Sequence, residues 1–237
     1  MKEVLALVEQ RKQEFAQLPF FKFLQDKSID PRQRLAWAPC LAPFAMGFAL
    51  LNKDDFRKEP TDDPLQEIIN RHTYEDDHHW EWFLEDLEKL GLNHSMKFSD
   101  AMRFFWGEET YKTRLVCHQI ALHTFRAEPI VVLAAIEAIE ATGNVVLALT
   151  AQIAQELQQI TKQKYRYFGA HHFRVEIGHA TGTDDVEQVL ESIQLTKEQK
   201  TQAFEVVEKV FDVFTESINE LMTYAEHHPI IQDLKAS

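Results

Sequence analysis

Apolar residues recur at intervals of three and four along nearly the whole chain, which is the pattern of amphipathic helices. A helix is expected to start near Asp62 and Asp63, with Pro64 in its first turn, and to end at Gly91. The same spacing predicts further helices over residues 2–25, 31–52, 98–107, 108–127, 129–163, 165–181, 184–193 and 196–228. No alternating strand pattern, repeat or linker interrupts them. We therefore predict an all-α protein, a single domain over residues 1–237 with about seven to nine helices.

Local signals refine some of these helices. Pro39 and Pro43 are expected to kink or break the second helix, because proline has no amide hydrogen to donate. Gly143 marks a bend in the helix over 129–163, and Thr196 with Gln199 has the spacing of a capping box. The last helix carries an apolar, phenylalanine-rich stripe that suits a homodimer. Five aromatic residues are expected in the core: Trp80, Trp82, Phe104, Phe105 and Trp106.

The charge of the chain limits its partners. A formal net charge of −13 argues against nucleic acid or an anionic membrane, which bind basic surfaces. The longest apolar run, Leu41 to Leu51, is shorter than the roughly 20 residues that span a bilayer. The charged N-terminus lacks a signal-peptide core, and two cysteines are too few for a disulfide framework. We expect a cytoplasmic protein that binds neither nucleic acid nor membrane.

One cluster of chemically active residues lies in the third predicted helix. His72, Glu75, Asp76 and His79 are spaced by three and four residues, so they share one helix face with large aromatic side chains. Acidic and imidazole groups on such a face indicate an inward-facing polar site. His78 lies about 100 degrees round the helix from His79, so the two are not expected to ligate one metal ion.

A second cluster has the same character. His172, Glu176 and His179 are spaced four and three residues apart, so one helix face presents imidazole, carboxylate and imidazole. This donor set suits iron, manganese or zinc. One such trio is as easily a surface network of hydrogen bonds, but two trios on separate helices predict a buried metal site.

Two glutamates interrupt the most apolar predicted helix. Glu137 and Glu140 lie among isoleucine and alanine residues, where burying a carboxylate costs free energy unless it is paired or bound to metal. The two are three residues apart, so both can reach one site or one can be exposed. In helix-bundle di-iron proteins, glutamates and Glu-x-x-His pairs project inward from facing helices. This chain offers these ligand types on three helices.

These segments resemble the haem-oxygenase-like di-iron oxidase and oxygenase superfamily. That superfamily includes CADD-like proteins and iron-containing redox enzymes and, more distantly, PQQ-synthase and TenA-type proteins. The run from His172 through Glu176 to His179 is similar to the family's His-x3-Asp-x2-His motif, with Glu in place of Asp. The segment HWEWFLEDLEKLG resembles the family's third-helix signature, and it favours His79 over His78 as a ligand.

The resemblance also bears on the remaining ligands. The residues AIEATG resemble the family's fourth ligand segment and favour Glu140 over Glu137. His72 stands where relatives carry an additional glutamate, and Glu75 is the alternative donor there. Haem is not expected, because no histidine precedes His72 to act as a proximal ligand.

Together these likenesses imply a haem-oxygenase-like helical bundle that holds iron and uses O2 to oxidise a small organic substrate. The metal is expected to be a di-iron centre, with manganese or a mixed pair as alternatives. Two other functions stay open: a metal-independent enzyme of PQQ-synthase or TenA type in cofactor or vitamin metabolism, and a non-catalytic binding protein. The expected metal ligands are His72, Glu75, Asp76, His79, Glu140, His172, Glu176 and His179.

Overall fold

Helices form the regular structure of the chain. The computed structural model describes residues 1–180, 190 and 192–230, and the side chains of all of these except 176–180. Helix accounts for 77% of the structure, and no strand occurs among the described residues. The all-α prediction is confirmed.

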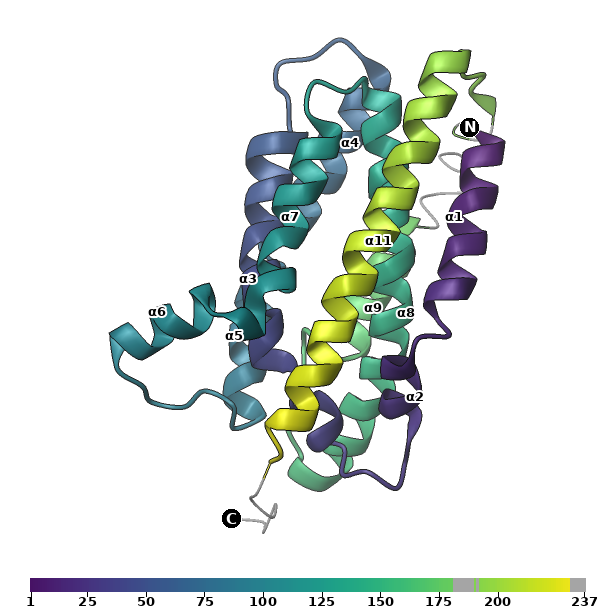
Figure 1. Ribbon diagram of the computed structural model, residues 1–237. Helices are drawn as coiled ribbons and strands as arrows, with labels where there is room; N and C mark the ends of the chain where they lie inside the picture. Colours follow the sequence, from purple (N-terminus) through teal and green to yellow (C-terminus); the bar gives the residue numbers. More distant parts are fainter. Residues whose placement is uncertain (181–189, 191, 231–237) are drawn as a thin grey trace.

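Two long helices form the centre of the bundle. α8 (Pro129–Thr161) and α11 (Lys197–His227) pack against each other (Figure 1). α1 (Lys2–Phe15) contacts both, α9 (Ala170–Ala180) lies against α8, and α7 (Tyr111–Thr124) lies against α11. The remaining elements are α2 (Pro19–Gln25), the 3-10 turn η1 (Gln33–Leu35), α3 (Ala38–Leu50), the π-helical turn η2 (Leu51–Phe56), α4 (Pro64–Asp76), α5 (His79–Lys89), α6 (Phe98–Trp106) and the 3-10 turn η3 (Glu108–Thr110).

α8 is apolar nearly all round, as core helices and membrane spans both are. Averaged over 18 residues, two segments have the length and hydropathy to cross a bilayer: Gln33–Phe56 and Pro129–Thr161. The sequence expectation, which considered only the longest apolar run, did not include them. In α8, 72% of that window is buried inside the bundle. Packing against neighbouring helices accounts for its composition without a membrane.

The apolar stripe of α11 packs into the bundle. The helix begins at the predicted capping box, in which Thr196 accepts the backbone N–H of Gln199 and the Gln199 side chain accepts that of Thr196. Phe204 is partly buried, and the rest of the stripe is buried: Val207, Phe211, Phe214, Ile218 and Leu221. These side chains form part of the core, so the stripe cannot also serve as a homodimer interface.

Proline residues divide the first two predicted helices. The helix expected over 2–25 is broken into α1 and α2, because Pro19 occupies the first turn of a new helix. The segment expected over 31–52 becomes η1, α3 and η2, with Pro39 in the first turn of α3 and Pro43 inside it. α8, in contrast, continues past Gly143 as one helix. The helix predicted over 184–193 lies largely outside the described residues.

The third predicted helix is interrupted at the cluster of chemically active residues. Asp63 caps its start, and Gly91 follows its end with a φ of 70°, as predicted. Between α4 and α5, however, His78 leaves the helical conformation with a φ of −126°. Arg57 holds the neighbouring Asp77 in a salt bridge of 2.7 Å. This contact comes from a distant loop, so periodicity alone did not reveal the break.

α6 projects from the bundle as an arm (Figure 1). None of its residues is buried. Trp106, which the sequence placed in the core, is 72% exposed. The helix itself was predicted correctly. Its Phe105 packs against the core, whereas Phe98, Met102 and Trp106 are exposed.

Candidate metal centre

Asp76 lies at the centre of the polar cluster. It is the last residue of α4 and is buried. Its Oδ2 lies 3.1 Å from Nε2 of His72, one turn earlier on the same helix. Its Oδ1 lies 3.8 Å from Nδ1 of His79, the first residue of α5. The two oxygens of one carboxylate therefore face two different imidazoles.

Glu140 reaches the same cluster from α8. Its Oε1 lies 3.5 Å from Nε2 of His72, and its side chain is buried. One ligand atom from each of His72, Asp76 and Glu140 lies within 4.8 Å of the others. Glu137, one turn earlier, is half-buried and is not part of this trio.

His172 closes the cluster from α9. Its Nε2 lies 3.1 Å from Nδ1 of His79, and its Nδ1 lies 2.9 Å from the backbone carbonyl oxygen of Tyr167. Both imidazoles are buried, and the ring of Trp82 stacks on that of His79 at 4.2 Å between centroids. A carbonyl oxygen only accepts, so Nδ1 of His172 donates to it and Nε2 faces His79. Histidines that ligate metals are commonly held in this way.

Asp86 positions the segment that leads into α9. This fully buried carboxylate on α5 accepts the backbone N–H groups of Arg166, Tyr167 and Phe168 at 2.9, 2.8 and 3.0 Å. Because these amides are bound to Asp86, α9 begins at Ala170 rather than near residue 165, as the sequence predicted. The contact fixes Tyr167, whose carbonyl holds His172.

Sequence reasoning did not assign Asp86 a role in the site. Asp86 lies on the same helix face as Trp82 and Phe83, and all three are buried. A single acid among large aromatic residues is the signal that could have identified it, because a buried carboxylate needs hydrogen-bond donors.

The other predicted ligands fall into two groups. Glu75 is exposed and is not part of the trio. The backbones of Glu176 and His179 belong to α9, but their side chains lie outside the described residues. The neighbouring histidines, His78 and His171, are exposed, which agrees with the choice of His79 and His172. The pKa of His171 is lowered, first by the loss of some hydration and then by the charges of Arg166 and Arg174.

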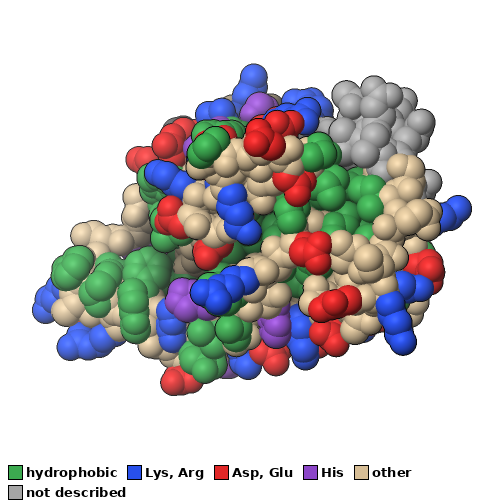
Figure 2. Space-filling view, turned by 90° about the horizontal axis from the view of Figure 1, so that it is seen from above, with side chains coloured by type: hydrophobic (Ala, Val, Ile, Leu, Met, Phe, Trp, Pro, Cys, Tyr) green, Lys and Arg blue, Asp and Glu red, His purple; other side chains and the backbone are tan. Residues whose placement is uncertain are grey.

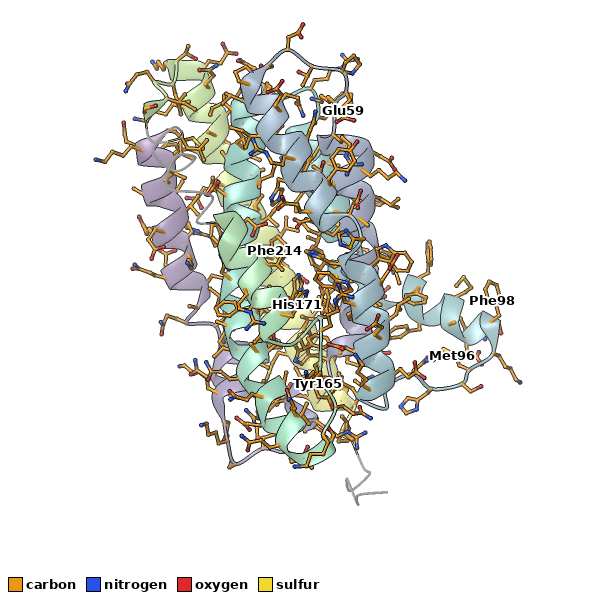
Figure 3. All side chains as sticks on the ribbon, turned by 180° about the vertical axis from the view of Figure 1, so that it is seen from behind. Glu59, Met96, Phe98, Tyr165, His171 and Phe214 are labelled. Carbon is orange, nitrogen blue, oxygen red and sulfur yellow. The ribbon has the colours of Figure 1, made fainter. Side chains whose placement is uncertain are left out.

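An apolar cavity adjoins the cluster. The cavity has a volume of about 100 Å³. The polar groups Asp76, His79, Glu140 and His172 form part of its wall. Most of the remaining lining is apolar and comes from α3, α8 and α11: Leu41, Phe44, Ala45, Phe48, Ile139, Val146, Leu147, Phe214, Ile218 and Leu221. Phe214 lies among the side chains that fill the middle of the bundle (Figure 3).

The donor atoms have the separations that ligands of metal ions can have. Two atoms that each lie about 2.1 Å from one ion are at most about 4.2 Å apart. The contacts in the cluster measure 3.1, 3.5, 3.8 and 3.1 Å. Asp76 lies between His72 with Glu140 on one side and His79 with His172 on the other. The trio of His72, Asp76 and Glu140 could therefore hold a metal ion, and His79 and His172 lie beside it.

Comparison with known proteins adds no further assignment. No protein-family model matches the chain, and no curated protein is significantly similar to it. The functional inference therefore rests on the residues of the site and on the sequence motifs.

Proposed function

We propose that this chain binds iron at the cluster around Asp76 and is a non-haem, O2-activating oxidoreductase for a small organic substrate. The observation that carries the proposal is the convergence of His72, Asp76 and Glu140 from α4 and α8 beside an apolar cavity, whose wall includes Asp76 and Glu140. The donor set and the sequence motifs both resemble those of haem-oxygenase-like di-iron proteins. That resemblance supplies the reaction class.

The charge of the cluster favours a bound cation. Asp76 and Glu140 place two carboxylates close together in the interior, and the His72 imidazole lies near both. Like charges at this separation oppose each other, and a divalent ion between them stabilises both. Imidazole and carboxylate together suit iron or manganese, so a manganese or mixed centre is the alternative to di-iron.

Each part of the chain then has a defined task. Bound iron supplies the redox chemistry with O2. Asp76, His72 and Glu140 hold the metal, and His79 and His172 extend the donor set toward a second ion. Asp86 and the Tyr167 carbonyl keep His172 in place, while the aromatic walls exclude water and seat the substrate.

O2 uptake by the iron-loaded protein tests this function. Protein loaded with Fe(II) without air should consume O2 faster than the same concentration of free Fe(II). His72→Ala and Glu140→Ala should lower the rate at least about tenfold, since each removes a ligand. His78→Ala, which changes the exposed neighbour of His79, should not. O2 uptake no faster than that of free Fe(II) would rule the function out.

One observation favours a second function, general acid–base catalysis without a metal. His79 and His172 are hydrogen-bonded to each other, and both line the cavity, where a buried imidazole pair can move a proton. This is the chemistry of a PQQ-synthase or TenA-type enzyme. Enzymatic activity that persists after metal ions are removed by a chelator, and that is lost in His79→Gln, would favour acid–base catalysis over iron-dependent oxidation.

A further inference from the structure

Gly143 provides space beside the polar cluster around Asp76. It lies on α8, one turn after Glu140, and lines the cavity. A Cβ atom added to it would meet no other atom within 4 Å. Neither a positive φ nor a close neighbour requires glycine here, and glycine destabilises a helix interior relative to alanine. What the glycine provides is open volume next to the Glu140 carboxylate.

Aromatic side chains form much of the wall of this space, and its two carboxylates, Asp76 and Glu140, belong to the polar cluster. Phe44 and Phe48 stack with their ring centroids 5.4 Å apart, and Phe214 meets Phe44 edge-on at the same distance. Among the described residues that line the cavity there is no lysine or arginine. A carboxylate or phosphate would therefore lose its hydration and gain no counter-charge from these walls, whereas an apolar ring or short alkyl group would lose little.

We propose that the cavity binds an uncharged apolar molecule, about the size of one benzene ring, against Gly143. An apolar protein cavity of about 150 Å³ binds benzene, and this one, at about 100 Å³, has about two-thirds of that volume. Its use as the substrate pocket rests on the proposed function; the binding itself does not. The bound molecule would lie between the phenylalanine walls and the carboxylate end, where oxidation is proposed to occur.

Toluene and benzoate, which share a ring but differ in charge, test this inference on the metal-free full chain. Toluene should raise the melting temperature in a concentration-dependent way, and benzoate should not. Gly143→Leu should abolish the toluene effect by filling the space, and Ala45→Leu should do the same from α3. Gln152→Leu, which adds the same side chain on an exposed face of α8, should leave the effect intact.

Three results would overturn the inference: no toluene effect in the wild type, an equal effect of benzoate, or a toluene effect that survives in folded Gly143→Leu and Ala45→Leu proteins. Circular dichroism establishes that each variant is folded. Iron uptake is measured separately on the same preparations. If toluene does not bind but iron uptake is normal, only this inference is refuted. If toluene binds but the protein takes up no iron, only the proposed function is refuted.

A separate observation concerns the arm formed by α6. Phe98 is 79% exposed and points away from the bundle together with Met96 (Figure 3). Met102, Trp106 and Tyr111 are also exposed. In the space-filling view, apolar side chains gather on the arm where it projects from the molecule (Figure 2). A helix with one apolar face uncovered is typical of an interaction surface.

The exposed area of the arm fits a second copy of this chain, which we infer as its partner. These five side chains expose about 600 Å² in total, given 150–250 Å² for a fully exposed aromatic residue. Two copies would together bury about 1,200 Å², the lower end of the range for stable specific interfaces.

Light scattering after size-exclusion chromatography measures this directly. The wild-type chain should have the mass of a dimer, and the double variant Phe98→Ser, Trp106→Ser should have the mass of a monomer with unchanged helix content. The control variant Leu122→Ser, Phe125→Ser removes exposed apolar residues elsewhere and should stay dimeric. A monomeric wild type at high micromolar concentration, or a dimeric arm variant, would refute the inference.

Discussion

At the scale of single residues, the hydrogen bond between His172 and the Tyr167 carbonyl decides which ring nitrogen faces the cluster. The 2.9 Å contact requires a proton on Nδ1 of His172. In the neutral ring, Nε2 then presents its lone pair toward Nδ1 of His79 at 3.1 Å. His79 must therefore donate from Nδ1. The protein holds His172 with its lone pair turned inward before any metal arrives.

The tautomers are measurable by long-range 1H–15N correlation NMR of the metal-free protein near neutral pH. Both His172 and His79 should appear with the proton on Nδ1, because each Nδ1 donates to an acceptor. His94, which is exposed, serves as the reference, since free imidazole favours the proton on Nε2. A proton on Nε2 of neutral His172 would contradict the structure.

The Cys40 thiol should make stability depend on alkaline pH. Burial, with the charge of Glu220 as a smaller cause, raises the pKa of Cys40 to about 12. The thiol ionises in the unfolded chain near pH 8.5 but stays protonated in the folded protein, so its contribution is complete below pH 8.5 and is lost as pH rises toward 12. From pH 8 to 10, wild type should lose about 2 kcal/mol more unfolding free energy than Cys40→Ala.

Urea unfolding of both proteins at the two pH values measures that difference. Burial also raises the pKa of Cys117, so Cys117→Ala should show a comparable change. Equal pH dependence in wild type and both cysteine variants would mean that the thiols ionise as readily in the folded protein as in the unfolded chain.

At the scale of elements, α5 and α9 are joined by one side chain. Asp86 binds three successive amides ahead of α9, which sets where α9 starts and how His172 is presented to the cluster. Lys89, 3.2 Å away, partly offsets its charge. The candidate site therefore depends on Asp86, which positions His172 through hydrogen bonds to the chain before α9.

Asp86→Asn should destabilise the fold by about 3 kcal/mol, because the amide offers one acceptor and sets its NH2 against backbone donors. It should also weaken iron binding in protein that is still folded. Glu85→Gln is the matched control: Glu85 pairs with the same Lys89 but is exposed, so its change should cost less than about 0.5 kcal/mol. Urea unfolding and iron titration check both. Equal effects of the two variants would refute the positioning role.

Periodicity predicted most helices, since an apolar stripe and its caps are local features. The ends of α6, α8 and α11 agree closely with expectation, and the choice of Glu140, His79 and His172 agrees with burial. The breaks at residues 16–18 and 77–78 and the late start of α9 were not predicted. Two of them depend on contacts between distant residues, from Arg57 to Asp77 and from Asp86 to the chain before α9. A sequence pattern does not encode such contacts.

At the scale of the whole molecule, the bundle brings polar groups from α4, α5, α8 and α9 to one side of an apolar cavity. α8 contributes both the Glu140 carboxylate and, through Gly143, the space beside it. The cost of burying carboxylates there is offset, in our account, by a metal ion. Metal binding is therefore the claim on which the proposed function depends.

Elemental analysis of the protein purified after expression with added iron tests that claim most directly. We predict about two iron ions per folded chain, as in helix-bundle di-iron proteins. Asp76→Ala should lose most of the metal because this carboxylate faces both donor pairs, whereas His78→Ala should retain it. Folded wild-type protein with less than about a tenth of an equivalent of iron, manganese or zinc would contradict the account.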